Sequence, residues 1–405
     1  MNELAYSTAQ HVLDETANTW IDTPLQSIFS LIRNPTPSKE PSPPPYYMAA
    51  QRLSLNKEVL FPQSAQKYAQ RSTLKALHND YQQARQQIEV TDDVQIKVEQ
   101  TLALLKDYTW SVSSSEEAVS LYDAARTNAA IAAARSGESE QILLLGGDVS
   151  GVQDFLYTIA ADQATKNLRG RSVYLQLLTD AVAHWLLHET GMPLTNLLYS
   201  GGGRFYLIVP AQFDTRLAYW RQTLGKFLLN VHQGELYIAL GSKNFSVTQN
   251  NDFADLWRGV NEKTNDDKRR RFAELEPADL AAIFAPRGHG GNTDSGCEVC
   301  GYLGQSDEFI DQDTEETHLR CKLCASFEEM GRKLNGACFI CIQPHEPTLR
   351  GRGRIAYHQV LCELGYSVWI EDERGTRERL QQRPNLRVSA MQDSNLNSWR
   401  QDFPR

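Results

Sequence analysis

The chain has no cysteine before Cys297, no uninterrupted run of 18 apolar residues and no excess of basic over acidic residues. The missing apolar run excludes an ordinary transmembrane helix, so we expect no contact with a membrane. The opening residues lack a basic stretch followed by an apolar one, which predicts a cytoplasmic protein without a signal peptide. A net charge of −9 argues against a protein that coats nucleic acid over its whole surface, so any RNA contact must be local.

The composition is otherwise that of an ordinary globular chain, with 41% hydrophobic and 22% charged residues. A length of 405 residues predicts two or three domains. Six prolines between Pro35 and Pro45 indicate a linker or exposed loop over 35–45, because proline lacks the N–H donor that helices and inner strands need. Helical patterns on both sides of this linker predict a helical N-terminal domain over residues 1–140.

The segment from Leu143 to Val209 carries the clearest structural pattern. A strand, LLLGG, leads into Asp148, and apolar residues around Leu177 and Leu178 then recur with the spacing of one buried helical face. Two short apolar runs joined by GGGR predict a hairpin, and a further helix and the strand ELYIAL complete the order β-α-β-β-α-β. This is the ferredoxin-like plan on which nucleotide-polymerising palms are built. The sequence therefore predicts an α+β chain that contains such a palm.

Two Cys-x2-Cys pairs, separated by twenty residues, predict a small zinc-binding module. Each pair can direct two thiolates at one ion, and two pairs complete a tetrahedron. The intervening loop is polar and acidic and has little apolar content with which to fold alone, so a metal would hold it. Two disulfides are the alternative, and they would need an oxidising compartment. The predicted ligands are Cys297, Cys300, Cys321 and Cys324.

The three remaining cysteines are expected to be structural. Cys338 and Cys341 stand in ACFICI, an apolar run that predicts a buried strand. Cys362 stands in a helical pattern and is expected to be a core residue.

The palm offers one carboxylate, Asp148, at the end of its first strand, and Ser150 stands where a second carboxylate would be needed. One carboxylate cannot assemble the metal pair that phosphoryl transfer requires, so we predict no catalytic residue here. Asp148 either grips a metal or caps the helix that follows. Ser150 and Gly151 can offer backbone N–H groups to a phosphate, and the glycines of the hairpin serve either the turn alone or a nucleotide that approaches the backbone. The candidate nucleotide-binding residues are Asp148, Ser150, Gly151, Gly201, Gly202 and Gly203.

Two basic groups are open to more than one interpretation. Arg169 and Arg171, in LRGRS, can contact a phosphate or a partner, or they belong to a solvated helix start. The run Lys268–Arg271 is flanked by acidic residues, so it indicates either a solvated helix face or a patch that faces RNA or protein.

Several of these motifs together resemble one known family. GDVSGVQDFL, LRGRSVYLQLL and YSGGGRFYLIVP are similar to the first palm of the large subunit of type III CRISPR effector complexes. That subunit is the polymerase-like Cas protein that makes cyclic oligoadenylates. Further similar stretches, TPLQSIFSLI, LLKDYTWSVSSS, SLYDAARTNAAIAAA, NEKTNDDKRRRFAEL and the paired CxxC, occur in the same order from about residue 20 to about residue 340.

The chain also departs from the family pattern. It has no His-Asp dipeptide, the mark of the family's nuclease domain, and no GGDD hairpin, the synthetic centre of its second palm. The GGDV at Gly146–Val149 ends a strand and does not lie between two strands. Ala124 stands where the family pattern leads us to expect histidine.

The resemblance implies a domain plan. A degenerate palm is expected over residues 141–260, a connecting helix with the zinc module over 261–335, and a strand-and-helix segment packing beside the palm, with the C-terminal tail, over 336–405.

The resemblance also implies a function. The chain would be a non-catalytic part of an antiviral ribonucleoprotein, scaffolding other type III Cas subunits, with guide RNA and target RNA reached through the complex. It would hold a structural Zn²⁺ and offer half of a cleft that ATP with Mg²⁺ could share. Two alternatives remain: half of a split cyclic oligoadenylate synthase completed by a GGDD-bearing palm chain, or a free-standing nucleotide-binding palm regulator.

Overall fold

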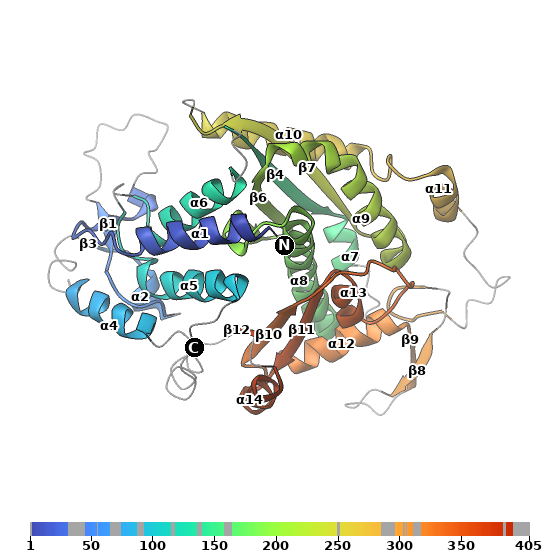
Figure 1. Cartoon of the computed structure of the whole chain (residues 1–405). Coiled ribbons are helices and arrows are strands. Elements are labelled where there is room, and N and C mark those ends of the chain that lie inside the picture. Colours follow the sequence, from blue (N-terminus) through green and yellow to red (C-terminus); the bar gives the residue numbers. More distant parts are fainter. Residues whose placement is uncertain are drawn as a thin grey trace, which may run out of the picture. The chain divides into compact units, whose positions relative to one another are not determined.

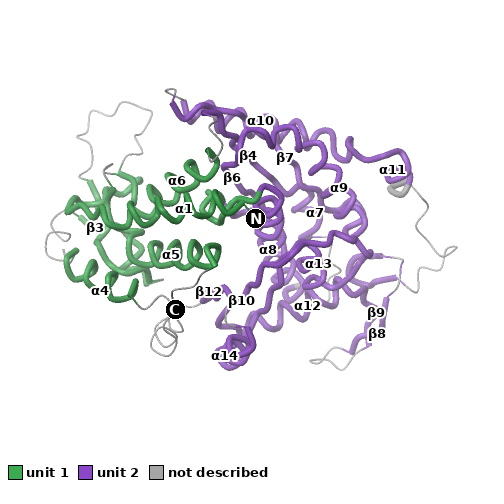
Figure 2. Tube along the Cα trace, viewed as in Figure 1, with its two compact units in different colours: residues 1–139, 191–198, 392–405 green, residues 140–190, 199–391 purple. Residues whose placement is uncertain are grey.

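The fold is described from a computed structural model of the chain, which forms two compact units (Figures 1 and 2). Unit 1 contains the described residues of 1–139 and 191–198, and unit 2 contains those of 140–190 and 199–391. The predicted linker, except Pro45, lies outside the described residues, as does the tail from residue 392. The structure describes residues 2–30, 45–54, 56–64, 74–86, 93–114, 118–135, 140–157, 164–248, 252–284, 296–302, 304, 306–310, 317–383 and 386–391.

Unit 1 is mainly helical. Its longer helices are α1 (Glu3–Thr16), α4 (Leu74–Gln86), α5 (Val94–Thr109) and α6 (Leu121–Ala134). Short elements are β1 (Leu25–Gln26), η1 (Ile28–Ser30), β2 (Tyr46–Met48), α2 (Lys57–Leu60), β3 (Gln63–Ser64) and η2 (Leu194–Asn196), and the three strands form one sheet.

Helix α1 packs against α5 and α6. Ala125, Ala129 and Ala133 of α6 are fully buried, and residues four apart share one helical face. Their small side chains let α1 approach closely, so the alanine-rich sequence of α6 forms a helix contact.

Unit 2 is built around a four-stranded sheet with the order β5-β6-β4-β7. Strand β4 pairs antiparallel with β6 and with β7. Since the chain runs strand, helix, strand, strand, helix, strand, this order is the ferredoxin-like one. The predicted α+β class is confirmed. The elements are β4 (Gln141–Ser150), α7 (Val152–Tyr157), α8 (Ala164–Thr190), β5 (Leu197–Gly201), β6 (Arg204–Pro210), η3 (Ala211–Arg216), α9 (Leu217–His232) and β7 (Tyr237–Ser246).

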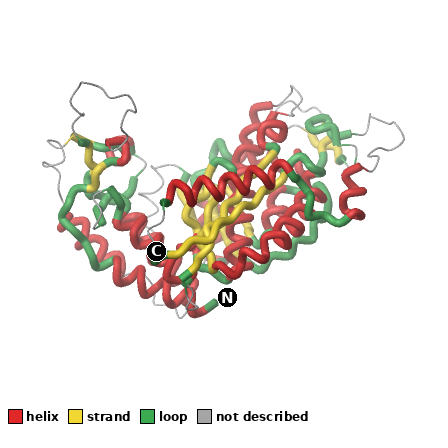
Figure 3. The backbone as a smooth tube through the Cα atoms, turned by 90° about the horizontal axis from the view of Figure 1, so that it is seen from above, coloured by secondary structure: helices red, strands yellow, loops and turns green. Residues whose placement is uncertain are grey.

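Helix α10 (Phe253–Arg269) lies across β4 and β7. Figure 3, which views the molecule from above, shows a long helix crossing the strands of this sheet. Tyr206 of β6 donates a hydrogen bond from its hydroxyl to Asn261 of α10 at 2.7 Å and packs against Trp257 with tilted rings whose centroids are 4.1 Å apart. One face of the sheet is therefore covered by α10, which runs across the predicted boundary at residue 260 between the palm and the connecting helix.

The rest of unit 2 contains a helix, α11 (Pro277–Phe284), a hairpin of β8 (Asp307–Ile310) and β9 (Thr317–Arg320), and a sheet of order β11-β10-β12. Its other elements are α12 (Lys322–Lys333), β10 (Phe339–Pro344), α13 (Tyr357–Glu363), β11 (Tyr366–Glu371), α14 (Glu373–Gln382) and β12 (Arg387–Ala390). The predicted domain boundaries within unit 2 stay predictions.

Helix α12 crosses α8 at close range because each helix has a glycine at the crossing. A Cβ on Gly170 would lie 2.0 Å from the carbonyl oxygen of Phe327, and a Cβ on Gly331 would lie 2.0 Å from that of Lys166. This reciprocal contact fixes the helix that carries two of the predicted metal ligands to the longest helix of the sheet domain.

No helix among the described residues combines the length and the apolar content that crossing a bilayer requires.

Candidate metal centre and nucleotide turn

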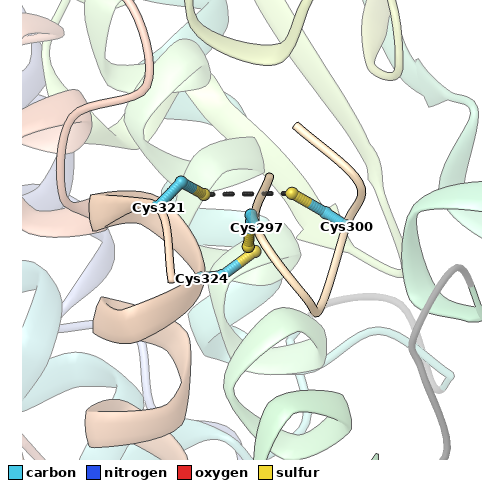
Figure 4. A group of neighbouring side chains, drawn as sticks. All are labelled: Cys297, Cys300, Cys321 and Cys324. Atoms are coloured by element: carbon cyan, nitrogen blue, oxygen red, sulfur yellow. Dashed lines mark hydrogen bonds between the residues drawn. The ribbon is translucent and has the colours of Figure 1, made fainter. Parts of the chain in front are cut away.

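The structure brings the four predicted zinc ligands together (Figure 4). Cys297 and Cys300 lie on a turn before β8, while Cys321 is the N-cap residue of α12 and Cys324 lies in its first turn. All four sulfur atoms lie within 4.8 Å of one another, and the Cys300 and Cys321 sulfurs are 3.9 Å apart.

These distances fit a metal better than disulfides. A tetrahedral site with Zn–S bonds of about 2.3 Å requires sulfur atoms roughly 3.8 Å apart. A disulfide needs about 2.05 Å, and all four cysteines are free thiols. Three of the four, Cys297, Cys321 and Cys324, are buried and Cys300 is half-buried, so the cluster is suited to hold an ion away from water.

Backbone hydrogen bonds shape the first pair of ligands. The N–H of Gly301 donates to the carbonyl of Cys297 at 2.8 Å, and the N–H of Cys297 donates to Tyr302 at 2.8 Å. The N–H of Glu298 donates to Leu319 in β9 at 3.0 Å. Strand β9, which pairs with β8 and leads into Cys321, therefore joins one ligand pair to the other.

The thiols also affect one another electrostatically. Hydrogen bonding among the thiols, Cys300 above all, lowers the pKa of Cys297, and the same interactions raise the pKa of Cys300 and of Cys324. The four thiols therefore titrate as one coupled group.

Two buried arginines lie against the sulfur atoms. Arg354 is 9% exposed and donates from Nη1 to the Cys300 sulfur at 3.0 Å. Arg171 is 3% exposed and donates from Nη2 to the Cys324 sulfur at 3.7 Å. The sequence offered Arg171 as a phosphate- or partner-binding residue or as a solvated one, and its burial contradicts these interpretations. Arg169, two residues away, contacts the Asn335 side chain at 2.5 Å.

Sequence reasoning missed Arg354 altogether. It lies in the loop LRGRGRI before α13, and a basic, glycine-containing loop gives no local signal for a buried thiolate partner.

Cys362 was also mispredicted: it is exposed, because it lies on the outer face of α13 while Val360 and Leu361 face the core. Cys341 is buried in β10 as expected, and Cys338 is half-buried.

The only carboxylate that the sequence offered on the first strand is held by two cations. The Asp148 side chain, which is 12% exposed, pairs with Arg204 and with Lys268, each at 2.8 Å. Arg204 lies opposite Asp148 on β6, and Lys268 comes from the last turn of α10. Asp148 is thus seen in ion pairs, where the sequence left metal binding and helix capping open.

The two glycine turns predicted to bind nucleotide lie at one end of the sheet. The N–H of Val149 donates to the carbonyl of Gly203 at 2.8 Å, which joins the end of β4 to the hairpin. Gly202 and Gly203 have φ values of 60° and 80°, a region that favours glycine. A Cβ on Gly202 would meet nothing within 4 Å, so the tip of this turn is open.

Gly151 is required by packing. Its φ is 90°, and a Cβ there would lie 2.0 Å from the carbonyl oxygen of Glu235. The turn between β4 and α7 therefore sits directly on the backbone that precedes β7. Ser150 is the last residue of β4 and precedes this turn.

The basic run Lys268–Arg271 is occupied by internal contacts. Lys268 pairs with Asp148, and Arg269 pairs with Asp266 at 3.0 Å. Arg271 donates to the carbonyl of Gly234 at 2.5 Å. Lys268 therefore holds the end of α10 to the sheet, whereas Arg269, Arg270 and Arg271 are exposed, as the interpretation of the run as a solvated helix face predicted.

Comparisons with known proteins agree with these features. Residues 141–286 match the family model "Csm1 subunit domain B". The Cas10/Csm1 single-strand-specific deoxyribonuclease of subtype III-A from Methanocaldococcus jannaschii is 31% identical over 199 residues, 45% of this chain and 24% of that protein. The counterpart from Thermococcus onnurineus is 28% identical over 291 residues, 66% of this chain and 35% of that protein.

Solved structures show the same fold. A Csm1–Csm4 cassette in complex with one ATP has a TM-score of 0.54 at 20% identity, covering 90% of this chain and 44% of that one. The Csm1–Csm4 subcomplex of the type III-A CRISPR-Csm interference complex has a TM-score of 0.55 at 20% identity, covering 89% and 44%. The chain spans less than half the length of these relatives. It is similar to the large type III CRISPR subunits of the Cas10/Csm1 family, and its residues 141–286 match the model of Csm1 domain B.

Proposed function

We propose that this chain is a non-catalytic, scaffolding part of a type III-A CRISPR effector complex and supplies half of an ATP cleft. The single observation that carries the proposal is the match of residues 141–286 to Csm1 domain B, on a sheet whose first-strand carboxylate is neutralised. Relatives of this fold have been solved with Csm4 and with ATP. Other Cas subunits are therefore the proposed partners, with guide RNA and target RNA reached through them.

The chemistry of the sheet supports a half-site that binds and does not catalyse. Joining nucleotides requires a metal pair that activates the attacking hydroxyl and steadies the leaving pyrophosphate. Asp148 already balances part of the charge of Arg204 and Lys268, so little negative charge is left for a divalent ion. The open tip at Gly202 and the exposed face of Arg204 instead suit the backbone and phosphates of a nucleotide whose metals are held elsewhere.

A split synthase is the second candidate, and the single carboxylate on the first strand of the sheet, Asp148, is the observation behind it. A GGDD-bearing palm chain would then bring the carboxylates, with ATP and Mg²⁺ held between the two palms. In that arrangement Ser150, Gly151 and Gly201–Gly203 would shape the acceptor's site.

The proposed metal is Zn²⁺ in a structural role. Four thiolates leave no open coordination position, which is the mark of a structural site. Elemental analysis of protein prepared without chelator should give one zinc per chain. Cys321→Ser should lower that ratio and loosen the module, and a metal-free preparation of the unaltered chain would contradict the assignment.

The test of the function is recovery of the tagged chain from its native host. Mass spectrometry and RNA sequencing should find Csm4-like and other Cas subunits together with a guide RNA. A lone monomer without RNA would contradict the effector role and favour a free-standing regulator. Recovery with a separate GGDD-bearing chain would favour the split synthase.

A further inference from the structure

We propose that the four-cysteine centre, when it holds its metal, fixes the position of the β4–α7 turn. Arg171 and Arg354 connect the cysteine sulfurs to the residues that support this turn. Metal occupancy would then set the geometry of Ser150 and Gly151, the turn proposed above as part of the nucleotide half-site. The inference rests on the proposed zinc and deepens the proposed function, since it makes the metal a positioning element of that half-site.

Arg354 forms the first connection. One guanidinium nitrogen donates to the Cys300 sulfur at 3.0 Å, and the other donates to the Glu235 carboxylate at 2.5 Å. The carbonyl oxygen of Glu235 is the atom against which Gly151 packs. The same residue therefore receives the arginine on its side chain and supports the turn with its backbone.

Arg171 forms the second connection. It donates from Nη1 to the carbonyl oxygen of Phe155, in α7, at 2.5 Å and from Nη2 to the Cys324 sulfur at 3.7 Å. Its guanidinium also lies over the Phe155 ring, 5.2 Å from the centroid. Helix α7 begins directly after Gly151, so both arginines reach the same turn from opposite ligand pairs.

Packing reinforces the polar contacts. Phe155 meets Phe327 of α12 edge to face, with centroids 5.7 Å apart, and the two side chains are 3% and 1% exposed. The N-terminal end of α12 carries Cys321 and Cys324. A shift of that end on metal loss would therefore move the aromatic contact of α7 as well.

Geometry gives the reason for the coupling. A bound ion would hold the four sulfur atoms around one centre, and so would fix the sulfur contacts of Arg354 and Arg171. Without the ion the two ligand pairs can separate, and each arginine would carry that movement to its other partner, Glu235 or Phe155. Only arginine can bridge in this way, because its planar fork presents N–H groups in two directions.

Hydrogen exchange of the full chain, followed by mass spectrometry, tests the proposal. Removing zinc with a chelator should speed exchange of the amides of 151–157 about tenfold or more, in addition to those around the cysteines. Arg354→Lys and Arg171→Lys should produce the same acceleration in protein that still contains one zinc. The matched control is Arg169→Lys, because Arg169 lies on the same helix but contacts Asn335 and no ligand.

Two outcomes would contradict this proposal. One is that chelation of the zinc changes the amide exchange rates only at 297–302 and 321–325. The other is Arg354→Lys behaving like Arg169→Lys. If Arg171→Lys does not fold, Glu235→Gln replaces it, since that change weakens the Arg354 connection and removes no buried cation. Failure of the chain to recover Cas subunits would leave these exchange results unchanged, so the two proposals fail separately.

Discussion

At the residue scale, Asp148 is a carboxylate that the palm motif retains but that pairs with two cations instead of offering its charge to a metal ion. Its Oδ2 atom pairs with Arg204 from the neighbouring strand and with Lys268 from α10. The carboxylate thus holds α10 to the end of β4. Removing its charge should therefore lower the stability of the fold.

Asp148→Asn should lower the free energy of unfolding by about 1 kcal/mol, because the half-buried Lys268 and the exposed Arg204 lose a counter-charge that is itself largely buried. Urea denaturation of both proteins measures the difference. Asp266→Asn is the control: that carboxylate is exposed and pairs only with Arg269 along the helix, so it should change stability by roughly 0.5 kcal/mol or less. Equal effects of the two changes would contradict the structural role.

His232 gives the molecule a pH dependence. Burial, with Arg354 and Arg171 adding to it, lowers its pKa to about 3, and the neutral ring pairs with the Tyr174 hydroxyl at 2.8 Å. An unfolded histidine has a pKa near 6.5. Between these values the unfolded chain binds a proton that the folded chain does not, so stability falls as pH falls below about 6.5.

Between pH 7 and pH 5, His232 should lower the free energy of unfolding by about 2 kcal/mol. His232→Gln keeps a hydrogen-bonding group but cannot titrate, so the free energy of unfolding of this variant should fall by about 2 kcal/mol less over the same interval. Urea unfolding at both pH values measures it, and loss of metal at low pH affects both proteins alike. Identical pH dependence of the two proteins would show that His232 is not buried in its neutral form.

At the element scale, the crossing of α12 and α8 depends on two glycines. Gly331→Ala should weaken this crossing, because the new methyl group would lie 2.0 Å from the carbonyl of Lys166. A cost of about 1–3 kcal/mol is expected for such overpacking, measured as a lower thermal midpoint. Gly336→Ala, just beyond α12, has open space around its Cβ and is the control. An unchanged midpoint in Gly331→Ala would show that the helices are further apart.

At the scale of the whole molecule, the chain should not synthesise oligoadenylates alone. Incubation with ATP and Mg²⁺ or Mn²⁺, followed by chromatography, should yield no linear or cyclic product, because its palm sheet offers no second carboxylate beside Asp148. With a GGDD-bearing partner, product should appear. Gly202→Val should then reduce ATP use by blocking approach to the open turn, more than Asp148→Ala does. Synthesis by the chain alone that Asp148→Ala abolishes would show a working catalytic palm.

The sequence by itself determined the features that depend on neighbouring residues. Alternation and helical spacing predicted the β-α-β-β-α-β order, since each element's apolar pattern reflects the face that it buries. The two Cys-x2-Cys pairs predicted the ligand set, because two cysteines with two residues between them can direct both thiolates at one ion. The glycines of the GGGR hairpin likewise predicted a turn with positive φ.

Only the tertiary structure decided which charges meet. Lys268 and Asp148 are 120 positions apart, Arg354 and Cys300 are 54 apart, and Arg171 and Cys324 are 153 apart. No periodicity relates such positions. The sequence therefore did not predict that Arg171 is buried or that Arg354 contacts a cysteine, and it wrongly placed Cys362 in the core. Long-range ion pairs form only where packed helices and strands bring two side chains together, and that position depends on every contact in the unit.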